Sequence, residues 1–196
     1  MIIETLPLIA FVFAGLFSPG PNVVMLTASG ARFGFRATIP HFLGVPIGTG
    51  IIAALSATGI GAALEAAPSL RFTLQIAAAA WILWLAFRTA QAGRAGRGDD
   101  RGKPFTFVQA ILFQAVNPKI WAVTLAASAG FGIGLGPIPE ATRMFLAFAG
   151  INLAVCMFWT SAGHLMRGLL ASDTIWRRFM LIMAIMMAST TILIFI

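Results

Sequence analysis

Cysteine and charged side chains are scarce in this sequence. Cys156 is the only cysteine among 196 residues, which excludes an internal disulfide, a paired-cysteine redox motif and a zinc site built from cysteines. Because it lies within an apolar run, Cys156 is interpreted as a small core residue. Charged residues make up 10% of the chain, against roughly 25% in soluble domains. So few charges cannot solvate an aqueous surface, and the composition predicts an integral membrane protein.

Acidic residues are the scarcest charged class, with six Asp and Glu against thirteen Lys and Arg. None lies deep in an apolar run, so the usual carboxylate relay for protons is missing. If a proton is carried, only histidine, Lys119 or the ligand could titrate. Hard cations need charged oxygen ligands and transition metals need imidazole or thiolate. Because His41 and His164 are not clustered with such groups, no metal site is expected.

Long apolar runs fill most of the chain. The mean hydropathy is +0.93, and a spanning helix needs about 20 apolar residues. Six runs qualify: residues 2–28, 39–62, 70–87, 105–130, 143–163 and 177–196. The first lacks the basic leader and cleavage site of a signal peptide, so we expect it to be retained as a span. The predicted fold class is an all-α integral membrane protein with six transmembrane helices.

Basic residues predict how these spans are oriented. The loops after the first, third and fifth runs hold Arg32, Arg36, Arg88, Arg94, Arg97, Arg101, Lys103, Arg167, Arg177 and Arg178. The opposite loops hold only Arg71 and Arg143. Short cytoplasmic loops are enriched in Lys and Arg, so both termini are predicted to face away from the cytoplasm. The net charge of +7 follows from this pattern, and no nucleic-acid partner is expected.

Two of the six runs are interrupted by proline. Ser18-Pro19-Gly20-Pro21-Asn22 interrupts the first, and Asn117-Pro118-Lys119 interrupts the fourth. Residues 1–90 and 105–196 thus each hold three spans, joined by a cytoplasmic linker at 91–104. An odd number of spans places the second half upside down relative to the first, which is a 3+3 inverted repeat. Broken helices at matching positions of such repeats indicate a transport site near the bilayer midplane.

The two interruptions carry the chemistry of the predicted site. Pro21 and Pro118 can each open a half-helix, with Gly20 supplying unusual backbone angles and Asn117 a side-chain cap. Helix N-termini attract anions, and Lys119, the one ionisable side chain deep in a span, could hold a carboxylate. Alternatively, Lys119 could reach water or pair with a backbone carbonyl. A zwitterionic amino acid fits this polarity, although an inorganic anion would satisfy half of it.

Polar side chains elsewhere in the spans extend this prediction. The amide oxygens of Asn22, Asn117 and Gln114 could accept bonds from a ligand ammonium. Asn152 could line the pocket or hydrogen-bond between helices. Small-residue pairs, Gly44 with Gly48 and Ala184 with Ala188, favour close helix packing, inside one chain or in a homodimer.

Taken together, these residues resemble the LysE/RhtB family of amino-acid exporters. The match runs in order over essentially the whole chain: Ser18 to Asn22, Ser29, Gly34 to Arg36, Gly44, Trp84 to Phe87, Gln114 to Lys119, Asn152 and Trp159. The proline-glycine motif with its Asn-Pro-Lys partner is specific, whereas the other matches alone are weak. Gln114 and Met180 depart from the family, where asparagine is common at both positions.

The resemblance implies a six-span carrier of a bacterial inner membrane that exports amino acids or close derivatives in exchange for protons. With the loop charges given above, both termini are then expected to be periplasmic. It carries site roles over to Ser18, Pro19, Gly20, Pro21, Asn22, Asn117, Pro118 and Lys119. The alternative is a carrier of another small ion or metabolite on the same fold. No H-E-x-x-H or G-x-S-x-G motif is present, so we expect neither an enzyme nor a cofactor.

Overall fold

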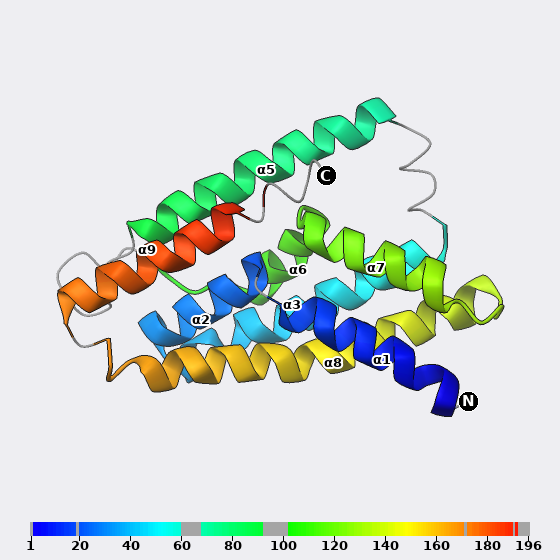
Figure 1. The fold of residues 1–196 in the computed structure, drawn as a ribbon, viewed down its shortest axis with the longest axis horizontal. Helices are drawn as coiled ribbons and strands as arrows, with labels where there is room; N and C mark the ends of the chain where they lie inside the picture. Colours follow the sequence, from blue (N-terminus) through cyan, green and yellow to red (C-terminus); the bar gives the residue numbers. More distant parts are fainter. Residues whose placement is uncertain are drawn as a thin grey trace.

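The computed structural model describes residues 2–18, 20–59, 68–91, 102–170, 172–189 and 191. Within these ranges the ordered elements are all helices. They are α1 (Ile2–Phe17), α2 (Pro21–Phe33), α3 (Phe35–Ala57), α5 (Pro68–Ala90), α6 (Phe107–Ala115), α7 (Pro118–Phe131), α8 (Pro137–Met166) and α9 (Asp173–Ser189). Pro19 and most of the predicted linker lie outside the described residues. The all-helical prediction is confirmed for the part that the structure describes (Figure 1).

Both interrupted runs are bent pairs of helices. The axis turns by 59° between α1 and α2 and by 65° between α6 and α7. The second helix of each pair begins at a proline, Pro21 or Pro118, as the sequence predicts. Proline is tolerated there because the first residue of a helix has no use for its backbone N–H as an intrahelical donor. The two bends lie near the middle of the molecule's long axis (Figure 1).

Several helices have the length and hydrophobicity of membrane spans. Among the described residues, α3 and α8 qualify alone, and the number rises to four if each bent pair counts as one span. This is the architecture of a membrane protein. The arrangement of six spans as an inverted repeat stays a prediction.

Helices α3 and α8 form the centre of the bundle. They pack against each other, α3 also contacts α6 and α7, and α8 also contacts α1 and α2. Glycine permits these close approaches: a Cβ on Gly44 would lie 2.4 Å from the carbonyl oxygen of Phe107, and one on Gly163 only 2.1 Å from that of Thr27. Ala184 is buried against α5. The small-residue faces predicted from the sequence are therefore used within one chain.

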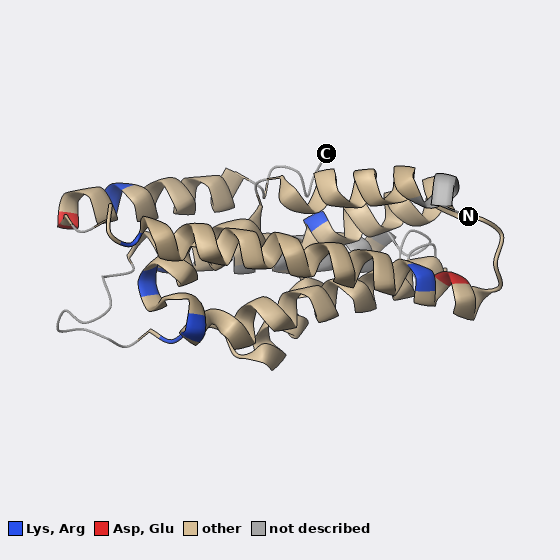
Figure 2. Ribbon diagram, turned by 90° about the horizontal axis from the view of Figure 1, so that it is seen from below, with Lys and Arg blue, Asp and Glu red and all other residues tan. Residues whose placement is uncertain are grey.

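Lys and Arg gather at one end of the bundle (Figure 2). Arg32 lies in the last turn of α2 and Arg88 in the last turn of α5. At the other end Arg143 donates to Glu140 and to the carbonyl oxygen of Phe131. Most of the described cations thus lie at one end of the helices, as expected for a protein oriented in the membrane by the charges of its loops.

Candidate functional site

The structure brings the two proline breaks into contact. Lys119, just after the second break, donates from Nζ to the carbonyl oxygen of Ser18 at 2.5 Å. Asn22 Nδ2 donates to Gln114 Oε1 at 2.8 Å, and Gln114 Nε2 donates back to Asn22 Oδ1 at 3.2 Å. Gln114 Nε2 also donates to the carbonyl oxygen of Ala110. Segments separated by 92 to 101 residues are thereby joined through polar groups, by a part-buried pair of amides and by an exposed bond from lysine to a carbonyl.

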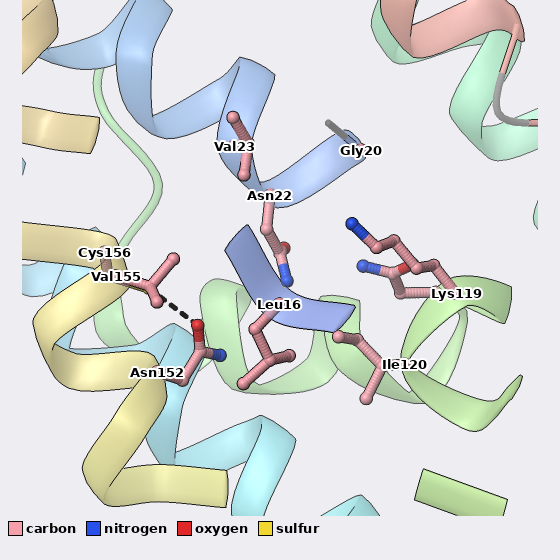
Figure 3. A pocket seen from close by; sticks show the side chains of 10 residues that line it. Leu16, Gly20, Asn22, Val23, Lys119, Ile120, Asn152, Val155 and Cys156 are labelled. Carbon is pink, nitrogen blue, oxygen red and sulfur yellow. Dashed lines mark hydrogen bonds between the residues drawn. The ribbon is translucent and has the colours of Figure 1, made fainter. Parts of the chain in front are cut away.

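A small central cavity lies beside these contacts (Figure 3). Its volume is about 10 Å³, which is room for about one water molecule. The lining residues are Leu16, Gly20, Asn22, Val23, Asn117, Lys119, Ile120, Asn152, Val155 and Cys156. An amino acid is larger than this space, so it can enter only if the lining helices move apart. Such movement around a central site is the basis of alternating access.

Half of the predicted site residues line the central cavity. They are Gly20, Asn22, Asn117, Lys119 and Asn152. Ser18 and Gln114 are the hydrogen-bond partners of Lys119 and Asn22, one step outside the lining. Pro21 and Pro118 begin the helices that carry these side chains, while Pro19 lies outside the described residues.

Asn117 does not have the capping role predicted from the sequence. It occupies the N-cap position of α7, but its side chain makes no capping hydrogen bond. The residue is 1% exposed, and neither Nδ2 nor Oδ1 has a partner in the described part of the chain. Because the side chain lines the cavity instead of turning back to the helix, a buried donor and acceptor are available to a ligand there.

Gly20 is needed for a reason other than its backbone angles. The sequence predicted an unusual conformation, but φ is 178° and ψ is 178°, an extended backbone open to any residue. What requires glycine is the approach of Lys119. A Cβ at position 20 would lie 2.8 Å from Lys119 Cδ and 3.0 Å from Nζ. The side chain of Lys119 points toward Gly20 (Figure 3), and the absence of a side chain at Gly20 leaves room for Lys119 to reach the Ser18 carbonyl.

Asn152 serves both of the roles considered for it. Its Nδ2 donates to Thr49 Oγ1 at 2.9 Å, which joins α8 to α3, and the residue also lines the cavity. Cys156 Sγ donates to Asn152 Oδ1 at 3.4 Å (Figure 3). Cys156 is buried, as predicted, but it is also part of the lining. Its position four residues after Asn152 was the available signal, because residues i and i+4 share a helix face.

The charged residue that lines the central cavity is positive. Lys119 is its only Lys or Arg, and no Asp or Glu is among the lining residues that the structure describes. Lys119 pairs with a backbone carbonyl, which was the structural alternative to a ligand role. His41 and His164 are not part of this lining. The site therefore combines one cation with neutral amides and a carbonyl, and it offers no anion to a positively charged side chain.

Known proteins share this sequence pattern. A sequence model of the LysE type translocator matches residues 13–196. The cysteine/O-acetylserine efflux protein of Salmonella choleraesuis (strain SC-B67) is 32% identical over 155 residues, which are 76% of each chain. The protein of the same name from Escherichia coli (strain K12) is 31% identical over 159 residues, which are 78% of each chain. No solved structure matches the chain. Together with the membrane-length helices, these relatives indicate a multi-pass protein of a bacterial inner membrane. The chain belongs to the LysE type translocator family.

Proposed function

We propose that this protein exports a small neutral amino acid or a close derivative, and that the substrate binds between the two proline breaks. The observation that carries the proposal is the side chain of Asn117, whose buried amide has no partner among the described residues and lines a cavity beside Lys119. An unsatisfied buried polar group costs about 1–3 kcal/mol. A zwitterion can satisfy both ends of this amide, with its carboxylate at Nδ2 and its ammonium at Oδ1.

The contact between Lys119 and Ser18 supports a specific exchange. In the structure the Lys119 ammonium donates a hydrogen bond to the carbonyl oxygen of Ser18. A bound amino acid can take over both partners: its carboxylate pairs with Lys119, and its own ammonium takes the Ser18 carbonyl that Lys119 leaves. The exchange keeps every charged group paired, which matters because an unpaired ion in a low-dielectric site is costly. Substrate binding and release would thus move Lys119 between two partners.

The same groups limit the class of substrate. A cationic side chain would lie near Lys119 without an acidic partner in the described lining. Two unit charges of the same sign 5 Å apart repel by about 3 kcal/mol at an effective dielectric constant of about 20. Neutral side chains avoid this cost, and the central cavity of about 10 Å³ favours small ones. The two relatives are named for the efflux of cysteine and O-acetylserine, compounds of this kind.

We further propose that the six spans form an inverted repeat with the site near the midplane. The packing supports it: exchanging the halves pairs α1 with α6, α2 with α7, α3 with α8 and α5 with α9. This exchange leaves the contacts α3–α8 and α5–α9 unchanged. It turns α3–α6 into α8–α1 and α3–α7 into α8–α2, and both of these contacts are present. The cation-rich end (Figure 2) would face the cytoplasm, with both termini outside. Protons are the proposed counter-ion. Lys119 is the basic residue of the central lining, and it would gain or lose the proton during exchange.

Transport in inverted membrane vesicles tests the proposal. Vesicles with the wild-type chain should take up labelled cysteine and O-acetylserine under a proton gradient, and lysine should not compete. Lys119→Met, which keeps an unbranched side chain one atom shorter and without the charge, should lower uptake at least about tenfold, the equivalent of about 1.4 kcal/mol. Lys119→Arg should retain part of it.

Arg178→Gln is the matched control, since it removes an exposed cation of α9 that does not line the central cavity. Uptake by Lys119→Met at the wild-type rate would refute the role of Lys119. Uptake of lysine at the rate of cysteine would refute the substrate class and favour a carrier of other metabolites.

A further inference from the structure

A second, larger cavity lies at the cation-rich end of the bundle. Its volume is about 500 Å³, and it is lined by one face of α2, by the C-terminal part of α5, by Met180 of α9 and by the segment that leads into α6. Nothing in the proposed transport step uses it. It is also far larger than the central cavity of about 10 Å³, so its natural occupant is larger than a small amino acid.

The lining of this end cavity has an amphiphilic character. Arg32, Arg88 and Lys103 contribute three cations, and no Asp or Glu lines it among the described residues. The Arg88 guanidinium lies over the Trp84 ring, 5.5 Å from its centroid, which orients the cation at the wall. The remaining wall is largely apolar, with Met25, Leu85 and Phe105 among its members. Cationic groups next to an apolar wall are complementary to an anionic headgroup attached to hydrocarbon.

A buried imidazole adds a polar group without a partner. His41 lines the end cavity, is 2% exposed, and its Nδ1 has no hydrogen-bond partner in the described part of the chain. Its ring packs against Phe105, with centroids 5.2 Å apart. Such a nitrogen can donate a hydrogen bond to a phosphate oxygen when it carries the ring proton, or accept one from a glycerol hydroxyl when it does not. The cavity therefore offers a neutral polar contact in addition to the three cations.

The position of α5 indicates where the hydrocarbon would go. In the described part of the chain α5 packs mainly on α9, and Leu83 and Phe87 on its other sides are 48% and 59% exposed. In a membrane protein such side chains face the acyl chains. Basic pockets between spanning helices at a membrane surface bind anionic lipid headgroups. We propose that the end cavity binds the phosphate headgroup of an anionic phospholipid, whose acyl chains lie along α5.

Binding of short-chain lipids to the purified full-length protein tests this proposal. The probes are dioctanoyl phosphatidylglycerol, dioctanoyl phosphatidylcholine and free glycerol 3-phosphate, and the readout is the dissociation constant from microscale thermophoresis in neutral detergent. We expect phosphatidylglycerol to bind at least about tenfold more tightly than the other two. Each surface cation contributes roughly fivefold in affinity for an anionic lipid. The double variant Arg88→Gln/Lys103→Gln should therefore weaken phosphatidylglycerol binding about 25-fold.

The control is Arg177→Gln/Arg178→Gln, which removes the same charge from exposed positions on α9 outside the end cavity. It should change the dissociation constant less than about twofold, because these two cations do not line the end cavity and water and salt screen their attraction to a headgroup bound there. Equal binding of the two lipids, or an equal loss in both double variants, would overturn the proposal. Glycerol 3-phosphate binding as tightly as phosphatidylglycerol would also overturn it, because the site would then take a free anion. Vesicle transport by Lys119 variants is unaffected by any of these results, so the two proposals fail separately.

Discussion

Three glycine-to-alanine substitutions separate the role of Lys119 from the stability of the fold. A Cβ at Gly20 would meet the flexible end of Lys119, with Cδ at 2.8 Å and Nζ at 3.0 Å. In Gly163→Ala the Cβ would lie 2.1 Å from the backbone oxygen of Thr27. At Gly150 it would meet nothing within 4 Å. Gly150 and Gly163 both lie in α8, so they form a matched pair for packing.

The expected magnitudes differ for physical reasons. In Gly20→Ala the Lys119 side chain can swing aside at little steric cost, but it loses the hydrogen bond to Ser18 and its place at the central cavity. The charged contact that Lys119 would make to the substrate carboxylate is worth about 1.5–3 kcal/mol, and its loss corresponds to roughly a tenfold to hundredfold loss of transport at low substrate. The free energy of unfolding should change by less than about 1 kcal/mol, because the bond between Lys119 and Ser18 is exposed and water can replace it.

Gly163→Ala should show the opposite behaviour. The helices α2 and α8 must separate by about 1 Å, and overpacking of this kind costs typically about 1–3 kcal/mol. The melting temperature should therefore fall. Gly150→Ala should be stabilised by about 0.5–1 kcal/mol, because alanine is the better helix former, and should transport normally.

The assay pairs cysteine uptake into inverted vesicles with thermal unfolding of the purified protein in detergent. The refuting result is a Gly20→Ala protein that is stable and transports at the wild-type rate, since Lys119 would then have lost its place without consequence. A large fall in the stability of Gly20→Ala would equally contradict the assignment of its effect to the site.

Two further predictions concern the polar groups around the central cavity. Gln114→Leu leaves the Asn22 amide without its partner, so the free energy of unfolding should fall by about 1–3 kcal/mol. The double variant Asn22→Leu/Gln114→Leu should recover part of this stability in a thermal melt. A loss that is not recovered would show that the two amides do not act as a pair. Cys156, the only cysteine in the chain, is 1% exposed. A small thiol reagent should modify it only when the site opens, and saturating substrate should slow the modification measured by intact-protein mass spectrometry; faster labelling with substrate, or none in transporting vesicles, would contradict the placement of Cys156 in the site.

The helix breaks could be predicted because their causes are local. Pro21 and Pro118 each begin a helix, since proline fits the first helical position and a glycine or asparagine stands directly before it. Proline alone is not sufficient, because Pro40 and Pro46 lie inside α3. Local reasoning of the same kind gave a wrong prediction at two positions, Gly20 and Asn117. Gly20 suggested special dihedral angles, whereas a Cβ there would meet and displace the side chain of Lys119. Asn117 suggested a capping side chain, whereas its amide lines the cavity.

Composition and local sequence were enough to predict a membrane protein, two apolar runs interrupted at proline, and one ionisable side chain, Lys119, deep in a span. These properties depend on residues adjacent in the chain. Three contacts could be found only from the folded chain: the pairing of Asn22 with Gln114, the bond from Lys119 to the Ser18 carbonyl, and the position of Cys156 in the lining. The first contact joins α2 to α6, the second joins the break after α1 to α7, and the third places a residue of α8 beside both breaks. Such contacts between distant segments follow from the shapes of whole helix faces.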